Sequence, residues 1–393
     1  MPSVCFYFQV HQPFRLRRYR FFDINQRHQY EDEALNRKVV NEVAQNCYLP
    51  ANRIMLELLQ KYRGDFRVAF SISGVALDQL EKHAPTVLDG FKRLADTGHV
   101  EFLNETYHHS LAFMFSKVEF KRQVLLHRKK IKSFFGQTAQ TFRNTELIYS
   151  NEVAQMAESL GYTAIVAEGA DTILGWRSPN YVYQPSGCLK LRCLLRNYRL
   201  SDDVAYRFSN RAWPEYALTA ERLAGWIHQI NAAGETINLF MNYEAFGEHQ
   251  WSDSGIFDFL RVIPRELLRH PHFRFRTPAE VAREYAPVAQ LDVPNFVSWA
   301  DVERDLTSWL GNGMQKDAAE AIYKLEKKVK QGKDPAILET WGRLQSSDHF
   351  YHMGTKWFAG GDMARRANPY PSPYDAYGNY MNILTDFYNR MEH

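Results

Sequence analysis

The stretch Thr236–Trp251 reads TINLFMNYEAFGEHQW, and its character changes half-way along. The first part is an almost unbroken apolar run, as expected of a parallel strand that is covered on both faces. The second part brings Asn242, Glu244, Glu248 and His249 together within eight residues. In a (β/α) barrel the side chains that follow the carboxyl ends of the strands form the functional site. This stretch therefore predicts a buried barrel strand that ends at such a site.

Further apolar runs of the same kind occur earlier in the chain. With Thr236–Glu244 they make seven predicted strands, the others being 4–10, 67–73, 100–107, 141–146, 164–169 and 191–197. Amphipathic stretches between them predict helices, among them 76–93, 118–135 and 218–233. Alternating strands and helices indicate an α/β fold. Because the count is seven rather than eight, we expect an incomplete or distorted (β/α) barrel, with an open doubly wound sheet as the alternative.

The strand pattern stops near residue 300. The segments that follow have helical patterns, at 316–330, 335–345 and 376–390. We therefore expect a (β/α) barrel domain over residues 1–299 and a C-terminal helical subdomain over 300–393 that completes the site.

The composition of the 393-residue chain narrows the class of protein. A net charge of +3 argues against a nucleic-acid partner, and no apolar run approaches the roughly 20 residues of a membrane span. The four cysteines have no CxxC spacing, and no signal peptide precedes the first strand, so we expect a cytoplasmic location. Aromatic residues make up 14% of the chain, enough to fill a core and to provide platforms on which sugar rings stack. The oligomeric state stays open.

Carboxylates follow two of the predicted strands and could act together. Glu146 lies where the fourth strand ends, and Glu244 lies where the seventh ends, two residues after Asn242. Two carboxyl groups that face each other across a pocket are the minimal machinery for breaking a glycosidic bond: one attacks the anomeric carbon or assists water, and the other protonates the leaving oxygen.

Several segments, in order along nearly the whole chain, resemble the conserved regions of glycoside hydrolase family 57, most closely its α-amylase subgroup. These segments are HQPFRL (11–16), VEFLNETYHHSL (100–111), FRNTELIY (142–149), FMNYEAFGEHQW (240–251), WADVERDLTSWLGN (299–312) and LQSSDHFYHM (344–353). The resemblance implies an incomplete seven-stranded barrel with a helical bundle, and a retaining double displacement on α-1,4-glucans (starch, glycogen, maltooligosaccharides) without a cofactor. It implies that Glu146 is the nucleophile and that the site includes His11, Gln12, Glu101, Glu105, Trp299, Asp348 and His349.

One position departs from the pattern that the resemblance implies. The family has an aspartate as acid/base where this chain has Asn242. An amide cannot donate a proton at useful acidity, so a loss of ~10²–10⁴-fold in rate is expected. Asparagine is nearly isosteric with aspartate, so glucan binding should survive. The substitution fits either an inactivated variant that traps a glucan or a member whose catalysis has degenerated.

Three carboxylates could replace the missing acid. Glu244 shares a strand face with Asn242 because side chains alternate with a period of two, and Asp202 and Asp203 follow the sixth strand. Hydrogen-bonding or loop-capping roles are the simpler interpretation of all three.

Two other classes of function remain open. The first is a non-catalytic α-glucan-binding or regulatory protein on the same fold. The second is a metal-dependent deacetylase, suggested by the histidines at 11, 108, 109, 249, 349 and 352. None of them has the HExxH or DxH spacing of a zinc site, so we predict no metal.

Three tryptophans could stack on glucose rings. Trp176, beside Arg177, lies in the loop after the fifth strand, Trp251 follows the acidic cluster, and Trp299 opens the late motif. Packing in the core is the alternative for each.

Overall fold

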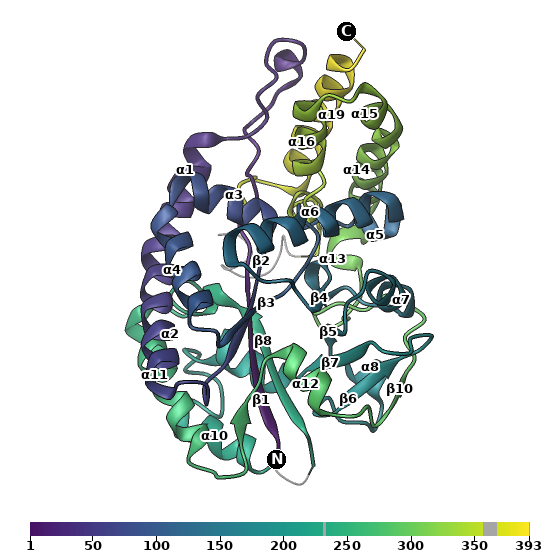
Figure 1. Cartoon of the computed structure of the whole chain (residues 1–393). Helices are drawn as coiled ribbons and strands as arrows, with labels where there is room; N and C mark the ends of the chain where they lie inside the picture. The colour runs from purple at the N-terminus through teal and green to yellow at the C-terminus, as the bar shows by residue number, and fades with distance from the viewer. Residues whose placement is uncertain (231–232, 357–367, 393) are drawn as a thin grey trace.

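The computed structural model describes residues 1–230, 233–356 and 368–392. Its strands form two five-stranded sheets (Figure 1). In the first sheet, β1 (Ser3–Val10) lies between β2 (Val68–Ile72) and β8 (Thr236–Asn242), and β3 (Val100–Phe102) lies beyond β2, all in parallel. In the second sheet, β4 (Thr141–Arg143), β5 (Ala164–Glu168) and β7 (Arg192–Arg196) are parallel neighbours.

The two sheets join at two seams and so close into a barrel. At one seam, the backbone N–H of Asn104 donates to the carbonyl of Thr141 at 3.0 Å, and that of Arg143 donates to the carbonyl of Asn104 at 2.8 Å. At the other seam, the N–H of Asn197 donates to the carbonyl of Asn238 at 2.9 Å. Each seam has fewer bonds than a full ladder, so the predicted incomplete seven-stranded (β/α) barrel is confirmed, with ring order β1-β2-β3-β4-β5-β7-β8.

This ring order puts β4 and β8 on opposite sides of the barrel. They are three strands apart through β5 and β7, and four apart through β3, β2 and β1. The amino-terminal half of the barrel interior is filled by buried side chains such as Cys5, Tyr7 and Phe240, as in other barrels of this kind. Side chains at the carboxyl ends of β4 and β8 can therefore face each other only above this layer.

Three short strands were not predicted. They are β6 (Val182–Pro185), which runs antiparallel to β7, β9 (Arg274–Phe275), which pairs with β1, and β10 (Ala289–Leu291), which pairs with β6. The third predicted strand is shorter than expected: the full ladder ends at Phe102, the chain still pairs at Leu103 and Asn104, and a turn follows at 107–108 before His109 at φ 53°.

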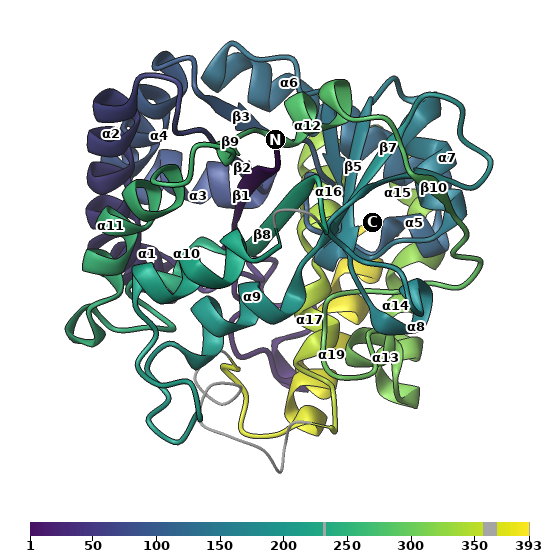
Figure 2. The same cartoon turned by 90° about the horizontal axis from the view of Figure 1, so that it is seen from below.

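Helices cover the outside of the barrel on both sides (Figures 1 and 2). The helices packed around the first sheet are α1 (Glu33–Val43), α2 (Leu49–Tyr62), α3 (Gly74–His83), α4 (Pro85–Asp96), α10 (Ala220–His228) and α11 (Ile256–Leu268). The remaining helices before residue 300 are α5 (Ala112–Phe115), α6 (Lys117–Phe135), α7 (Asn151–Ser159), α8 (Asp171–Leu174), α9 (Tyr198–Asp202) and α12 (Pro278–Glu284).

Two predicted helices have different bounds from those expected. The stretch 76–93 forms α3 and α4, because Pro85 cannot continue α3 but suits the first position of a new helix. The stretch 218–233 is helical only to His228, and residues 231–232 lie outside the described residues.

Helices follow residue 300, as the sequence predicts. They are α13 (Thr307–Leu310), α14 (Gly313–Lys324), α15 (Glu326–Gly332), α16 (Pro335–Arg343), α17 (Ser347–Tyr351) and α19 (Pro373–Arg390). Their buried side chains, such as Ala319, Trp341 and Phe387, belong to the same apolar cluster as Phe142 and Ile165 of the barrel. We propose that 300–393, of which 357–367 and 393 lie outside the described residues, is a subdomain built onto the barrel. Among the described helices, none has both the length and the hydropathy needed to span a bilayer.

Candidate active site

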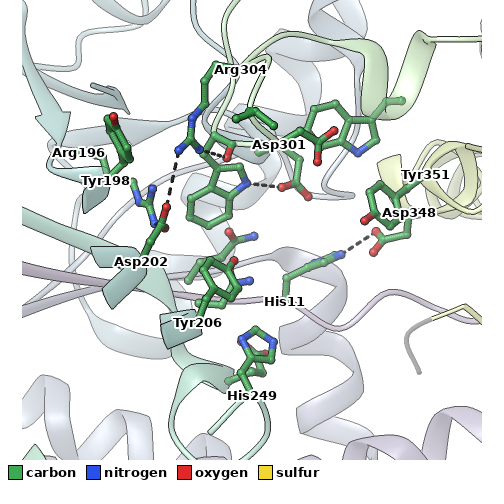
Figure 3. Close-up of a pocket in the computed structure, with 18 of the residues that line it drawn as sticks. His11, Arg196, Tyr198, Asp202, Tyr206, His249, Asp301, Arg304, Asp348 and Tyr351 are labelled. Atoms are coloured by element: carbon green, nitrogen blue, oxygen red, sulfur yellow. Dashed lines mark hydrogen bonds and ion pairs between the residues drawn. The ribbon is translucent and has the colours of Figure 1, made fainter. Parts of the chain in front are cut away.

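A cavity of about 920 Å³ lies where the carboxyl ends of the barrel strands meet. His11 reaches it from the end of β1, Glu146 from the end of β4, Arg196 from the end of β7 and Asn242 from the end of β8. Figure 3 shows His11 and Asp348 directed toward one another on one side, and Arg196, Asp202 and Arg304 gathered on another. Polar strand ends thus converge on one mouth, and α17 adds a wall to it.

Glu146 sits on a strained turn that follows β4. Its backbone has φ 55°, and Leu147 has φ 51°, so two successive non-glycine residues are left-handed. Such a conformation costs about 1–2 kcal/mol per residue and persists only where neighbouring contacts hold it. Here the N–H of Leu147 donates to the carbonyl of Asn144 at 3.0 Å, and the N–H of Trp299 donates to the carbonyl of Glu146 at 3.3 Å. The turn leaves the Glu146 carboxylate at the cavity wall.

Two donors hold the Glu146 carboxylate, one on each oxygen. His109 Nε2 lies 2.9 Å from Oε1, and Trp299 Nε1 donates to Oε2 at 2.6 Å. Burial alone would raise the pKa of Glu146, but the hydrogen bond and charge of His109, the charge of Arg143 and the Trp299 bond bring the pKa below its ordinary value. The side chain keeps 20% of its surface exposed. Glu146 is therefore an accessible carboxylate anion at neutral pH, as a nucleophile must be.

His109 is a fully buried imidazolium between two carboxylates. Its Nδ1 lies 3.1 Å from Glu105 Oε2, so both ring nitrogens face an acidic oxygen. Burial lowers the pKa of His109, but the hydrogen bonds to Glu105 and Glu146 outweigh it and raise the pKa to about 9. Burial likewise opposes the ionisation of Glu105, but His109 and Arg143 bring its pKa down to about 2. Glu105 thus lies one layer behind the cavity and acts on Glu146 through His109.

Asn242 ends β8 and lines the same cavity as Glu146. Its backbone pairs in register with Gln9 of β1, and its side-chain amide makes no hydrogen bond to any residue of 1–230, 233–356 or 368–392. Since β8 lies opposite β4 in the ring, Glu146 and Asn242 approach the cavity from opposite walls. The amide is free to contact a molecule held between them.

β8 ends at Asn242 and Glu244 lies in the 3-10 turn Tyr243–Ala245, so the prediction that the two share a strand face was wrong. Glu244 nevertheless lines the cavity and keeps only 8% of its surface exposed. The hydroxyl of Tyr48 donates to its Oε1, and the amide of Gln12, another cavity residue, reaches the same oxygen at 3.5 Å. Burial raises the pKa of Glu244 to about 7, although these hydrogen bonds partly oppose the rise. This carboxyl group therefore exchanges a proton near neutral pH.

His11 joins the barrel to the C-terminal helices. Its Nε2 lies 2.9 Å from Asp348 Oδ2, its Nδ1 lies 2.7 Å from the hydroxyl of Ser73, and its ring stacks on His109 at 3.8 Å between centroids. Burial would raise the pKa of Asp348, but the charge and hydrogen bond of His11 hold it well below its usual range. Asp348 comes from α17, so residues beyond 300 build part of the cavity wall.

Several residues singled out from the sequence lie away from the cavity. Glu101 is the second residue of β3, so its carboxylate lies near the amino-terminal end of the barrel, where it accepts from Thr141 and from the N–H of Ala279 at the start of α12. His349 does not line the cavity and bonds to the carbonyl of Arg343 at 3.2 Å. Asp203 pairs with Arg207.

The remaining predicted sugar contacts are surface residues. Trp176 is 95% exposed in the loop after α8, Trp251 is 49% exposed, and neither lines the cavity. Arg177 donates to the backbone carbonyls of Leu174 and Ile173, and so stabilises its own loop. Of the three tryptophans, Trp299 alone lies in the wall.

A charge cluster in the cavity wall was not predicted. Arg196 and Arg304 both contact the buried carboxylate of Glu168, at 3.0 and 3.2 Å, and both contact Asp202. Glu168 and Arg196 are polar residues at the ends of the fifth and sixth predicted strands, but their pairing was not predicted, and Arg304 could have been found as a member of the WADVERD segment. Within the described ranges, no three His, Cys, Asp or Glu side chains are grouped in a way that could hold a metal ion.

Comparison with known proteins agrees with this architecture. A sequence model described as "Glycosyl hydrolase family 57" matches residues 5–294. The chain belongs to glycosyl hydrolase family 57. It is 43% identical, over 98% of its own length and 84% of the relative's, to a Methanocaldococcus jannaschii protein named "Putative alpha-amylase".

Solved structures of other proteins share the fold at low sequence identity. A branching enzyme from Pyrococcus horikoshii superposes with a TM-score of 0.70 at 14% identity, covering 98% of this chain and 88% of the other. A 4-alpha-glucanotransferase from Thermococcus litoralis superposes with a TM-score of 0.66 at 14% identity over 89% of this chain. This chain spans 56% of the length of that glucanotransferase.

Proposed function

We propose that this family 57 member binds α-1,4-glucans and acts on them by a retaining double displacement, with Glu146 as the nucleophile. Asn242 occupies the position of the acid/base aspartate, so turnover is slow. The observation that carries the proposal is the Glu146 carboxylate, which is ionised, partly exposed and held by His109 and Trp299 at the wall opposite Asn242. A carboxylate so oriented can attack an anomeric carbon in the cavity.

The substrate class is supported by the relatives and by the cavity. Relatives named for amylase, branching and glucanotransferase activities all act on α-glucans. The wall offers hydrogen-bonding groups for sugar hydroxyls at His11, Gln12, Glu244 and Asp348, and an indole at Trp299. Starch, glycogen and maltooligosaccharides are the proposed ligands. The four cysteines are free and buried, which is compatible with the proposed cytoplasmic location.

The test is release of reducing sugar from starch by the wild-type chain and by Asn242→Asp. The variant should be faster by ~10²-fold or more, because a carboxyl group returns to the position of the acid/base. Asn242→Asp combined with Glu146→Gln is the matched control and should be inactive. Equal rates with and without Glu146 would refute its role as nucleophile.

The alternative of a non-catalytic glucan-binding protein makes a different prediction for the same variants. In that case Asn242→Asp releases no reducing sugar from starch, while calorimetry still detects binding of maltoheptaose to the wild-type chain and to the variant. The free amide of Asn242 is the observation that favours retained binding.

A further inference from the structure

The proposed function leaves one chemical role unfilled, and the inference drawn here rests on that function. With Glu146 as nucleophile, a second group must protonate the leaving oxygen and later take a proton from water. The amide of Asn242 can do neither. Any replacement must be a carboxyl group or another titratable group that lines the cavity and can hold a proton at working pH. The cavity carboxyl groups are Glu146, Asp171, Asp202, Glu244, Asp301 and Asp348.

Most of these carboxyl groups are already bonded to a basic side chain. Asp348 pairs with His11 at 2.9 Å, Asp171 with Arg199 at 3.4 Å, and Asp202 with both Arg196 and Arg304. Each of these carboxyl groups is therefore occupied by a partner of its own, and none is left to contact a leaving oxygen.

Asp301 is excluded by its position. Burial raises its pKa, although the ammonium of Lys356 at 3.9 Å and the hydroxyl of Ser308 oppose the rise. Asp301 follows Trp299, whose indole touches Glu146, so it enters the cavity from the wall of the nucleophile. The acid must approach the glycosidic bond from the other side of the anomeric carbon.

Glu244 differs from the rest in its surroundings. It forms no ion pair with the described residues, and its side-chain donors, Tyr48 and Gln12, are both neutral. Both side-chain donors reach Oε1, and backbone N–H groups of Glu244 and His11 also donate to the carboxyl group. The group is nearly buried, which disfavours its anion. Its raised pKa agrees with this description.

Glu244 also lies on the correct wall. It follows Asn242 by two residues at the end of β8, opposite β4 and Glu146. We propose that Glu244 performs the proton transfers that an aspartate at position 242 would otherwise perform. It thereby sustains slow turnover in this chain.

The two steps balance as follows. In the first, a Glu146 oxygen bonds to the anomeric carbon, the bond to the leaving oxygen breaks, and the proton of Glu244 passes to that oxygen. In the second, the Glu244 carboxylate takes a proton from water, the water oxygen bonds to the anomeric carbon, and Glu146 is released as a carboxylate. The enzyme ends in its starting state.

The experiment compares two substrates in Glu244→Gln. Maltopentaose needs a proton on its leaving oxygen, whereas α-maltosyl fluoride loses fluoride without one. The variant should cleave maltopentaose at least ~10²-fold more slowly than wild type but release the first equivalent of fluoride within a few-fold of the wild-type rate. Added azide, which attacks without a base, should then restore turnover and yield maltosyl azide.

Controls separate this inference from the proposed function. Glu248→Gln changes a carboxylate of the same motif that binds Asn46 and does not line the cavity, so it should leave both rates unchanged. Tyr48→Phe serves as a second variant in case Glu244→Gln fails to fold. The rate of maltopentaose cleavage should fall on the alkaline side near pH 7, and this variant should shift that fall to higher pH, because the Tyr48 hydrogen bond lowers the pKa of Glu244.

An unchanged maltopentaose rate in Glu244→Gln would overturn the inference. So would a wild-type chain that releases fluoride but never cleaves maltopentaose, and that result would leave the role of Glu146 intact. If neither substrate reacts with wild type or with Asn242→Asp, the proposed function itself fails.

Discussion

The imidazolium of His109 between Glu105 and Glu146 should make the stability of this protein depend on pH in a defined window. The informative change is His109→Asn. Asparagine tolerates the left-handed backbone at this position, where φ is 53°, and it removes the titrating charge without adding bulk. The variant loses the charge-assisted bonds to both carboxylates.

The magnitude follows from the pKa of His109. The native pKa of about 9 lies above the ordinary 6.5, and at 1.36 kcal/mol per pH unit the difference corresponds to about 3 kcal/mol. Because the folded pKa is the higher one, this stabilisation is complete below pH 6.5 and is lost as the pH rises through about 9. The ring is fully buried, so solvent does not screen the interaction.

The assay is the free energy of unfolding in urea at pH 6 and at pH 9.5 for both chains. Wild type should exceed His109→Asn by about 3 kcal/mol more at pH 6 than at pH 9.5. If the two chains differ in free energy of unfolding by the same amount at both pH values, His109 is not an imidazolium in the folded protein. In parallel, the variant should form the glycosyl-enzyme from α-maltosyl fluoride more slowly below neutral pH, because Glu146 loses the charge that keeps it ionised.

Two further predictions concern His108, which precedes His109 in the sequence, and Trp299, which donates a hydrogen bond to Glu146. His108 is fully buried, neither ring nitrogen has a hydrogen-bond partner among the described residues, and burial holds its pKa well below the ordinary value. His108→Leu should raise the free energy of unfolding by ~1–3 kcal/mol. It should also reduce the loss of stability below pH 6.5, where only the unfolded wild-type chain binds the proton on this histidine. Urea unfolding at pH 5 and pH 7 measures both effects, and an equal fall in the free energy of unfolding from pH 7 to pH 5 in the two chains would contradict the prediction. Trp299→Phe keeps an aromatic side chain but removes the 2.6 Å donation to Glu146, so fluoride release from α-maltosyl fluoride should slow about 10-fold or more. An unchanged rate would mean that the indole N–H does not support the nucleophile.

The sequence predicted the barrel well because its signal is local. Most of the seven ring strands are apolar runs that can be recognised alone, and Asn242 stands out because polarity follows such a run. The extent of each element was harder to predict. Whether 76–93 is one helix or two depends on Pro85, and how far β3 continues depends on a turn at 107–108.

The partners of site residues could not be predicted because they depend on distant parts of the chain. His108 and His109 are adjacent in sequence, yet only the left-handed backbone at His109 directs its ring between Glu105 and Glu146. Glu101 and Glu105 look alike in the same motif, but they lie at opposite ends of the barrel layer. His11 meets Asp348 across 337 positions of sequence, a contact that needs α17 in place.

The most direct measurement of the central claim is a crystal structure of the chain after reaction with 5-fluoro-α-maltosyl fluoride. The account predicts a covalent bond between the anomeric carbon and Glu146, with the Asn242 amide on the opposite face of the same sugar ring and Glu244 on that wall. A sugar attached to another residue, or a ring bound with position 242 turned away from it, would contradict the account.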